Sequence, residues 1–401
     1  MKTHYLYCGL DVHKDTVFAC ALDEGGQKEI EQFGTMTCDL ESLKEWLEER
    51  SVGQVAMEST SIYWYPIWRM LEDDFQLTLV NPFFIKQMPG RKTDMKDAEW
   101  IATLLSKGMM RGSLIPNKLI RILRDYERRY VYLQGRLCSC LQELERLLIK
   151  CNIRISSLTS NIEAGSVMKV VERLIEGEKD PSVLLKEVHG RVRNRHKERV
   201  REALRGFVDE HDRFLLEQAK DDYEHFTTQA EALQKQMEQL CDTYYHEEME
   251  LLCTIPGVQR KAAMAIIAET GGDMDAFQTP ERLVSWTGLR PRNDESAGKI
   301  KSKRTTHGNK YLRRILLQTA WGVSHSKSAF LSKKYQELLK RKSAKKAIVA
   351  IARKQEIIIW HVLSKKEPYR EPRLKKDAQK TARQLAYHKR CIAQLEAQQA
   401  K

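Results

Sequence analysis

The chain has 401 residues, enough for two or three domains, and carries a formal net charge of +13, which favours a polyanionic partner such as nucleic acid. It contains no run of about twenty apolar residues and no signal-peptide core, so we expect neither a membrane span nor secretion. Its nine cysteines form no CxxC pair, and we expect reduced, mostly buried thiols of a cytosolic protein.

The first 115 residues have the pattern of one α/β domain. Apolar runs predict five strands, at 5–10, 16–23, 29–36, 52–58 and 77–80. Helices are predicted at 39–49, capped by Asp39, at 61–71, and at 94–107, capped by Thr93. Three early strands followed by alternating helix and strand indicate a mixed sheet flanked by helices.

Four acidic residues stand at strand ends and in a first helical turn of this domain. Asp11 ends the first strand, Glu58 ends the fourth, and Asp94 and Asp97 share one helix face. We predict that these four acids meet and hold magnesium, because magnesium prefers carboxylate oxygens. In two-metal phosphoryl transfer, two such ions bind about 3.5–4 Å apart. Acids at such positions also serve as helix caps and solvated groups, so a structural role stays open on this pattern alone.

From about residue 118 the apolar residues recur at alternating four-residue and three-residue spacings. One such stripe covers 119–151 and a second covers 216–244. These repeats predict two coiled-coil helices, forming an antiparallel hairpin or the arm of a dimer. The linking segment 152–208 is expected to hold short helices. Its basic tract 191–197 has two interpretations, a phosphate contact and a solvated polar loop.

A third region begins at Leu251. The segment 252–258 contains a Pro-Gly turn and leads into an apolar helix at 261–269, a pattern typical of a helix-hairpin-helix. Such a turn offers backbone N–H groups to a phosphate, although Pro-Gly also opens helices for structural reasons. Further helices with apolar faces are predicted at 309–323, 330–341 and 344–363. They complete a compact α domain, followed by a basic tail.

The same region contains a long interval of one charge sign. No acidic residue occurs between Glu295 and Glu337. A purely solvated face rarely shows one sign over that length, so we expect nucleic-acid contacts here. The candidate residues are Lys299, Lys301, Lys303, Arg304, Lys310, Arg313 and Arg314.

Short motifs at both ends of the chain resemble those of a known enzyme family. The N-terminal motifs are Gly9–Lys14, Met57–Thr60 and Lys92–Ala98. They resemble the DEDD signature of the bacterial transposases of insertion-sequence family 110 and their relatives in family 1111. The C-terminal motifs resemble the transposase domain of the same family: Ile255–Val258, Trp286–Pro291, Glu295–Lys299 and His307–Arg313.

This resemblance implies an architecture and an activity. It implies an RNase H-like (RuvC-like) α/β domain, a long helical coiled coil, and an all-α transposase domain with the helix-hairpin-helix-like element. We place these at 1–115, 116–250 and 251–365, with a basic tail at 366–401. The implied function is an RNA-guided DNA transposase that recombines donor and target DNA. Its implied partners are a structured bridge RNA and other copies of the chain, as a dimer assembling to a tetramer.

The resemblance also implies site residues. It assigns Asp11, Glu58, Asp94 and Asp97 as ligands of magnesium, two ions per site. The nucleophile of the family is a serine that becomes covalently joined to DNA, and the matching position is Ser296. Some relatives have Ser-Ser-Gly-Gly where this chain has Glu-Ser-Ala-Gly. On the residues alone, a serine in a flexible loop is the ordinary interpretation, and other hydroxyls compete: Ser285, Ser302, Thr305 and Thr306.

The acids and Ser296 lie about two hundred residues apart. We therefore expect a composite site of the acids and Ser296, built either within one chain or from Ser296 of one subunit and the acids of another. Two other functions fit the residues. One is a metal nuclease such as a junction resolvase, which cuts with water and leaves no protein–DNA adduct. The other is a non-catalytic architectural or RNA-binding protein with structural acids.

Overall fold

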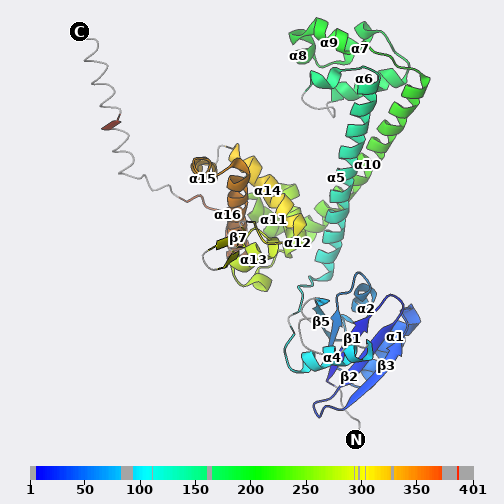
Figure 1. Cartoon of the computed structure of the whole chain (residues 1–401), viewed down its shortest axis with the longest axis vertical. Helices are drawn as coiled ribbons and strands as arrows, with labels where there is room; N and C mark the ends of the chain where they lie inside the picture. Colours follow the sequence, from blue (N-terminus) through cyan, green and yellow to red (C-terminus); the bar gives the residue numbers. More distant parts are fainter. Residues whose placement is uncertain are drawn as a thin grey trace. The chain divides into compact units, whose positions relative to one another are not determined.

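The computed structural model describes residues 6–82, 94–110, 112–159, 165–292, 294–296, 299–302, 304–326, 329–372 and 386–387. The chain divides into two compact units, Met1–Pro116 and Asn117–Lys401 (Figure 1). None of the helices in the described ranges combines the length and the apolar character that crossing a membrane requires.

A five-stranded mixed sheet forms the centre of the N-terminal unit, in the order β3-β2-β1-β4-β5. Strand β1 pairs antiparallel with β2, and β2 pairs antiparallel with β3. Strands β4 and β5 continue the sheet in parallel on the other side of β1. The prediction of a mixed sheet with helices is confirmed. The strands are β1 (Tyr7–Val12), β2 (Val17–Leu22), β3 (Lys28–Phe33), β4 (Gln54–Glu58) and β5 (Gln76–Val80).

Helices α1 (Thr37–Glu49) and α2 (Trp64–Leu71) cover one face of this sheet, where their apolar side chains share a core with alternate residues of β1 and β4. Asp39 does not cap α1 as the sequence predicted. It is the third helical residue, and its Oδ2 accepts a hydrogen bond from the backbone N–H of Met36 at 3.0 Å. The helix begins two residues earlier than predicted because this carboxylate reaches back to the residue that precedes the helix.

Helix α4 (Asp94–Ser106) packs across the opposite face of the sheet (Figure 1). Gly9 of β1 allows its close approach, since a methyl group on Gly9 would overlap the backbone oxygen of Ala98 and the backbone nitrogen of Ala102. The small side chains of Ala98 and Ala102 are themselves fully buried. The sequence therefore brings the helix backbone directly onto the strand.

Replacing Gly9 by alanine is expected to destabilise the N-terminal unit by about 1–3 kcal/mol, the usual cost of overpacking a core. The added methyl meets backbone atoms, so the whole helix α4 must move away from the sheet. Urea unfolding measures the effect. Gly53→Ala is the control, because a methyl there would meet only Leu6 O at 3.9 Å. Equal stability of the two variants would contradict this account of the packing.

The second unit begins with two long helices, α5 (Lys118–Lys150) and α10 (Glu210–Tyr244), which lie side by side (Figure 1). They run in opposite directions, because Lys150 Nζ at the end of α5 lies 3.0 Å from Asp212 Oδ1 near the start of α10. The buried residues of α5 include Leu133, Cys140 and Leu144, which belong to the predicted stripe. Two long helices therefore pack along the apolar positions that the spacing indicated.

Four short helices follow α5 and pack at its far end around a core that they share with the end of α5 and the start of α10. The basic tract 191–197 lies on two of them, and most of its side chains are exposed. A short 3-10 helix at Ile155–Ser157 precedes these four helices. The helices are α6 (Gly165–Ile175), α7 (Pro181–Glu187), α8 (Gly190–Arg195) and α9 (Lys197–Ala203).

The remaining helices form a cluster whose core also includes Ile120 and Leu123 of α5 and Met237 of α10. The cluster is mostly helical rather than all-α, because a two-stranded hairpin, β6 (Asp294–Ser296) and β7 (Lys299–Ser302), lies between two of its helices. The helices are α11 (His246–Cys253), α12 (Arg260–Thr270), α13 (Pro280–Thr287), α14 (Lys310–Ser324), α15 (Ala329–Leu339) and α16 (Ala344–Lys365).

The predicted Pro-Gly turn joins α11 to α12 and faces the interior of this cluster. Gly257 has a φ of +84°, which favours glycine, and a methyl there would overlap Val323 and the carbonyl oxygen of Thr319. Gln355, fully buried on α16, donates to the carbonyl oxygen of Pro256 at 2.9 Å. This turn is therefore held from within by α14 and α16.

The eight cysteines of the described ranges are all free thiols, and five of them are buried. Burial is the main cause that raises the pKa of Cys20 to about 11 and that of Cys241 to about 12. These two thiols are therefore uncharged and unreactive at neutral pH.

Candidate catalytic site

Two of the predicted acids occupy neighbouring strand ends. Strands β1 and β4 are parallel, and Leu10 pairs with Met57, so Asp11 and Glu58 are the next residues along each strand. Leu10 and Met57 belong to the core under α1 and α2. Because side chains alternate along a strand, Asp11 and Glu58 both lie on the opposite face, about 4.8 Å apart at the backbone.

Asp11 is nearly sealed from solvent. Its exposed fraction is 5%, although the strand ends one residue later. His13 Nε2 lies 3.1 Å from Asp11 Oδ2, and the side chain of His13 is 44% exposed. A buried carboxylate is stable only beside positive charge or hydrogen-bond donors. This environment therefore suits a cation next to Asp11.

Glu58 is more open to solvent than Asp11 and is only partly buried. Its Oε1 accepts a hydrogen bond from Thr60 Oγ1 at 3.2 Å. The backbone N–H of Ser59 donates to Val80 O at 2.9 Å, so the chain stays paired with β5 just beyond Glu58. A firmly held backbone thus presents a carboxylate at the edge of the sheet.

The other two acids lie at the start of α4. Asp94 is its first residue, and Asp97 is partly buried and directly precedes Ala98, the residue packed over Gly9. The position of the Asp94 side chain, like the predicted cap Thr93, falls outside what the structure describes. Among the side chains that it does describe, no three His, Cys, Asp or Glu residues gather closely enough to hold a metal ion. The four-acid site therefore stays a prediction.

Ser296 lies in the C-terminal cluster, at the end of β6, where it pairs with Lys299 across the tip of the hairpin. The sequence suggested a flexible loop here. The structure instead shows two short strands, whose pairing continues outward through a bridge between Pro291 and Thr305. The side chain of Ser296 is outside the described part of the chain. A hydroxyl near the tip of a hairpin is nevertheless held on a defined backbone.

The base of this hairpin is fixed to α14. Arg313 donates through Nη1 to Gly288 O at 2.6 Å and through Nη2 to Thr305 Oγ1 at 2.9 Å. Gly288 has a φ of +77°, and a methyl there would meet the backbone of 306–308. Strands β6 and β7 therefore extend from a base that these contacts hold in place.

The seven basic candidates differ in their surroundings. Arg304 and Lys310 are exposed, whereas Arg313 bonds within the cluster and Arg314 Nη2 lies 4.0 Å from Glu127 Oε1. Lys303 and the side chains of Lys299 and Lys301 lie outside the described residues, although β7 contains both of these lysines. Exposed cations thus flank the hairpin, while two of the predicted contacts have internal partners.

A buried acid lies behind the hairpin base. Glu356 of α16 is 1% exposed and accepts a hydrogen bond from Thr287 Oγ1, next to Gly288. Burial raises its pKa from 4.5 to about 7, while Thr287 and Arg353 oppose that rise. The protonated carboxyl is therefore favoured in the folded protein below neutral pH.

Glu356 should make the fold less stable as pH rises. Below about pH 4.5 the carboxyl is protonated in both the folded and the unfolded state, so its full contribution to the free energy of unfolding is present. Between pH 4.5 and about 7 the unfolded chain ionises first, so stability is lost, on the order of 3 kcal/mol. Glu356→Gln should lack this loss in urea unfolding across that range, while the exposed Glu250→Gln should keep it. Identical pH profiles for wild type and Glu356→Gln would exclude this role.

Comparisons with known proteins agree across both units. Residues 8–152 match a family model for DEDD transposases of IS110, described as "Transposase", and residues 249–336 match the "Transposase IS116/IS110/IS902 family". The "Transposase for insertion sequence element IS1111A" of Coxiella burnetii is 26% identical over 381 residues, 90% of each chain. The "Probable family 20 transposase" of Pseudomonas aeruginosa is 25% identical over 327 residues, covering 79% of this chain and 85% of that protein.

A further relative carries a different name. The "Pilin gene-inverting protein" of Moraxella bovis is 30% identical over 194 residues, which is 47% of this chain and 58% of that protein. Its name describes the inversion of a pilin gene.

Proposed function

The chain belongs to the IS110-type transposase family and is a DNA-recombining enzyme, and from this premise we propose that it cuts and rejoins DNA with metal-binding carboxylates and a covalent Ser–DNA intermediate. The observation that carries the proposal is the adjacency of Asp11 and Glu58 on one face of the sheet, within the part matched to DEDD transposases.

The strand order supports an RNase H-like (RuvC-like) domain. Three antiparallel strands in chain order are followed by two parallel strands on the far side of β1, which gives the order β3-β2-β1-β4-β5. Asp11 lies one residue before the end of β1 and Glu58 ends β4. Asp94 and Asp97 lie in the first turn of the helix that crosses the sheet, so their positions in the chain support the proposal of one four-acid site.

The donor set suits magnesium. It consists of hard carboxylate oxygens, and Asp11 is buried to 5% exposure, where a cation would offset the cost of its charge. Bound magnesium, as two ions, would activate an attacking oxygen and stabilise the leaving oxygen. The protein's own contribution is to fix Asp11 and Glu58 on paired strands, so that little reorganisation accompanies the reaction.

Ser296 is the proposed nucleophile. Its hydroxyl would attack a DNA phosphorus and displace one deoxyribose oxygen, which leaves as a hydroxyl with the proton that the serine loses. A phosphodiester then joins the protein to one strand end. The displaced hydroxyl of another strand would reverse the step and rejoin the DNA. Phosphodiester energy is conserved, so no ATP is needed. The hairpin supports this assignment, because it carries Ser296 and Lys299 as a pair near exposed cations.

The proposed partners are donor DNA, target DNA, a structured bridge RNA and further copies of the chain. The net charge of +13 and the exposed Arg304 and Lys310 support polyanion binding. The antiparallel pair of α5 and α10 supports a coiled-coil arm. We propose that this arm joins subunits, from dimer to tetramer, so that Ser296 of one meets the acids of another.

One experiment separates this function from its competitors. The protein is incubated with end-labelled DNA, magnesium and its element-encoded RNA, then denatured and run on a gel with and without protease. A labelled band that protease shifts is the expected Ser–DNA adduct. Cleaved DNA without such a band would indicate a metal nuclease such as a junction resolvase. Binding without cleavage would indicate a non-catalytic nucleic-acid-binding protein.

A further inference from the structure

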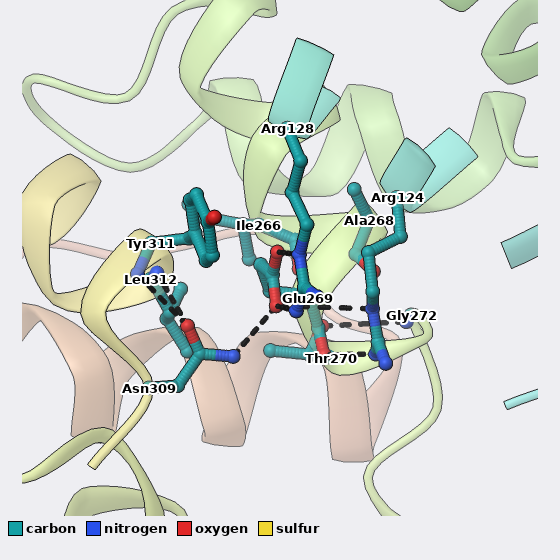
Figure 2. Close-up of polar contacts among 10 residues, drawn as sticks. All are labelled: Arg124, Arg128, Ile266, Ala268, Glu269, Thr270, Gly272, Asn309, Tyr311 and Leu312. Atoms are coloured by element: carbon teal, nitrogen blue, oxygen red, sulfur yellow. Dashed lines mark hydrogen bonds and ion pairs between the residues drawn. The ribbon is translucent and has the colours of Figure 1, made fainter. Parts of the chain in front are cut away.

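A buried carboxylate joins helix α12 to the long helix α5 and to the start of α14 (Figure 2). Glu269, in the last turn of α12, is 1% exposed. Arg128 of α5 donates through Nε and Nη2 to its two carboxylate oxygens, each at 3.1 Å. Asn309 donates through Nδ2 to Oε2 at 2.6 Å. One side chain thus holds a long helix on one side and the residue before α14 on the other.

Asn309 has a second role at the same place. Its Oδ1 accepts hydrogen bonds from the backbone N–H groups of Tyr311 at 2.9 Å and Leu312 at 3.0 Å, and so caps α14. The guanidinium of Arg128 lies over the ring of Tyr311, 4.6 Å from its centre (Figure 2). The first turn of α14 is therefore tied to α5 both directly and through Glu269.

Asn309 also adjoins the base of the hairpin. Its backbone N–H donates to Trp286 O at 3.0 Å. A methyl on Gly308 would overlap the backbone of 286–288, so these two segments are in direct backbone contact. Beyond them, Thr306 N–H donates to Arg290 O at 3.0 Å and begins the pairing that leads to β6 and β7. A continuous chain of contacts thus runs from α5 to the strands that carry Ser296.

A buried charged network of this kind is not the arrangement that fold stability alone would favour. A carboxylate near the C-terminal end of a helix faces the negative end of the helix dipole. Arg124 compensates in part, donating to the carbonyl oxygens of Ala268 at 3.0 Å and Glu269 at 2.8 Å. An apolar residue would fill a buried position at lower cost, whereas a paired carboxylate fixes the direction of each partner. These features indicate that Glu269 orients its partners Arg128 and Asn309.

We propose that Glu269 is a positioning residue for strand exchange: through Asn309 it fixes the β6–β7 hairpin, and with it Ser296, in register with α5. The proposal rests on the proposed role of Ser296 as nucleophile. Its consequence is that the long helix and the nucleophile move as one body. Neither Glu269 nor Asn309 contacts DNA in this scheme, so both act on the rate of chemistry and not on binding.

The test exchanges the two polar groups. Asn309→Asp keeps an oxygen cap for α14 but sets a carboxylate against Glu269, and Glu269→Gln removes the charge that Arg128 binds. Each single variant should form the covalent adduct about tenfold to a hundredfold more slowly at saturating DNA, the scale expected for a misplaced reacting group. The double variant Glu269→Gln/Asn309→Asp restores the donor–acceptor pair between positions 269 and 309 with reversed roles. Because Arg128 Nη2 donates to the same oxygen of Glu269 as Asn309 does, the new amide also faces Arg128, and the double should recover part of the rate.

Binding and folding are followed in the same samples. DNA affinity should change little between the singles and the double. The urea midpoint should fall in the singles, because each disturbs a buried charge pair, so adduct rates are compared under conditions in which every variant is folded. Asn309→Ser, which keeps a capping oxygen and adds no charge, serves if Asn309→Asp does not fold. Wild-type adduct rates in Asn309→Ser or Asn309→Asp would overturn the proposal. An adduct that persists in Ser296→Ala would overturn the nucleophile assignment instead, so the two failures are distinguishable.

Discussion

Asp11→Asn is expected to abolish strand cleavage, with a loss of at least about a thousandfold. The substitution keeps the size of the side chain and removes the negative charge that a cation beside it requires, and electrostatic stabilisation of this kind is worth several kcal/mol in phosphoryl transfer. Asp11 is 5% exposed and lies inside a paired strand, so the amide should remain in place. Cleavage of labelled DNA over a range of magnesium concentrations measures the effect.

The matched control is Asp15→Asn. Asp15 is exposed in the turn that follows β1, four residues from Asp11, and it should tolerate the loss of charge. A second measurement does not depend on catalysis. Magnesium or manganese should raise the thermal stability of the wild type and of Asp15→Asn, because an ion that binds only the folded state stabilises it. Cleavage at the wild-type rate by Asp11→Asn would remove the acids from the mechanism.

The strands of the N-terminal sheet could be predicted from sequence because each strand follows from a local pattern. Apolar runs such as 16–23 locate strands, and an acid that ends a run locates the edge of the sheet. That Asp11 and Glu58 share a face follows from alternation along paired strands, and the observed register of Leu10 with Met57 agrees. The relation of these acids to Asp94 depends on the path of the chain before α4, which no local pattern determines.

The hairpin β6–β7 was not predicted, for a physical reason. Its strands are three and four residues long and are mostly polar or charged, so neither shows apolar alternation. The strands exist because their base is held by distant residues, among them Arg313 and Gly288. Contacts between residues far apart in sequence produce no periodic pattern of apolar residues. Sequence patterns therefore indicated a loop where tertiary contacts form strands.

The Glu269 network was missed for the same reason, although a signal was present. Glu269 ends the run Ala-Met-Ala-Ile-Ile-Ala, so an acid follows an otherwise apolar helix and must be buried with it. Such an acid requires a cation or several donors. Its partners Arg128 and Asn309 are 141 and 40 residues away in sequence. The need for a partner could be predicted, but not the identity of that partner.

Ser296→Ala is expected to remove the covalent adduct and all recombinant product, while DNA and RNA binding remain near wild-type levels. Alanine has no hydroxyl to form the bond with phosphorus, and no other group at this position supplies one. The control is Ser302→Ala, in the facing strand of the hairpin, whose hydroxyl oxygen accepts from the backbone N–H of Arg304 at 3.2 Å. It should keep most of the activity. Recombination by Ser296→Ala at the wild-type rate would show that another group attacks the DNA.

The two inactive variants also test how the site is assembled. If Ser296 of one subunit works with the acids of another, a mixture of Asp11→Asn and Ser296→Ala proteins contains pairings in which an intact serine faces an intact acid site. Mixed assemblies should then regain adduct formation, and the adduct should form only on the subunit that carries Asp11→Asn. A tag of different mass on each variant identifies that subunit on a denaturing gel. A site built within one chain gives no recovery, because every such site lacks either the hydroxyl or the carboxylate.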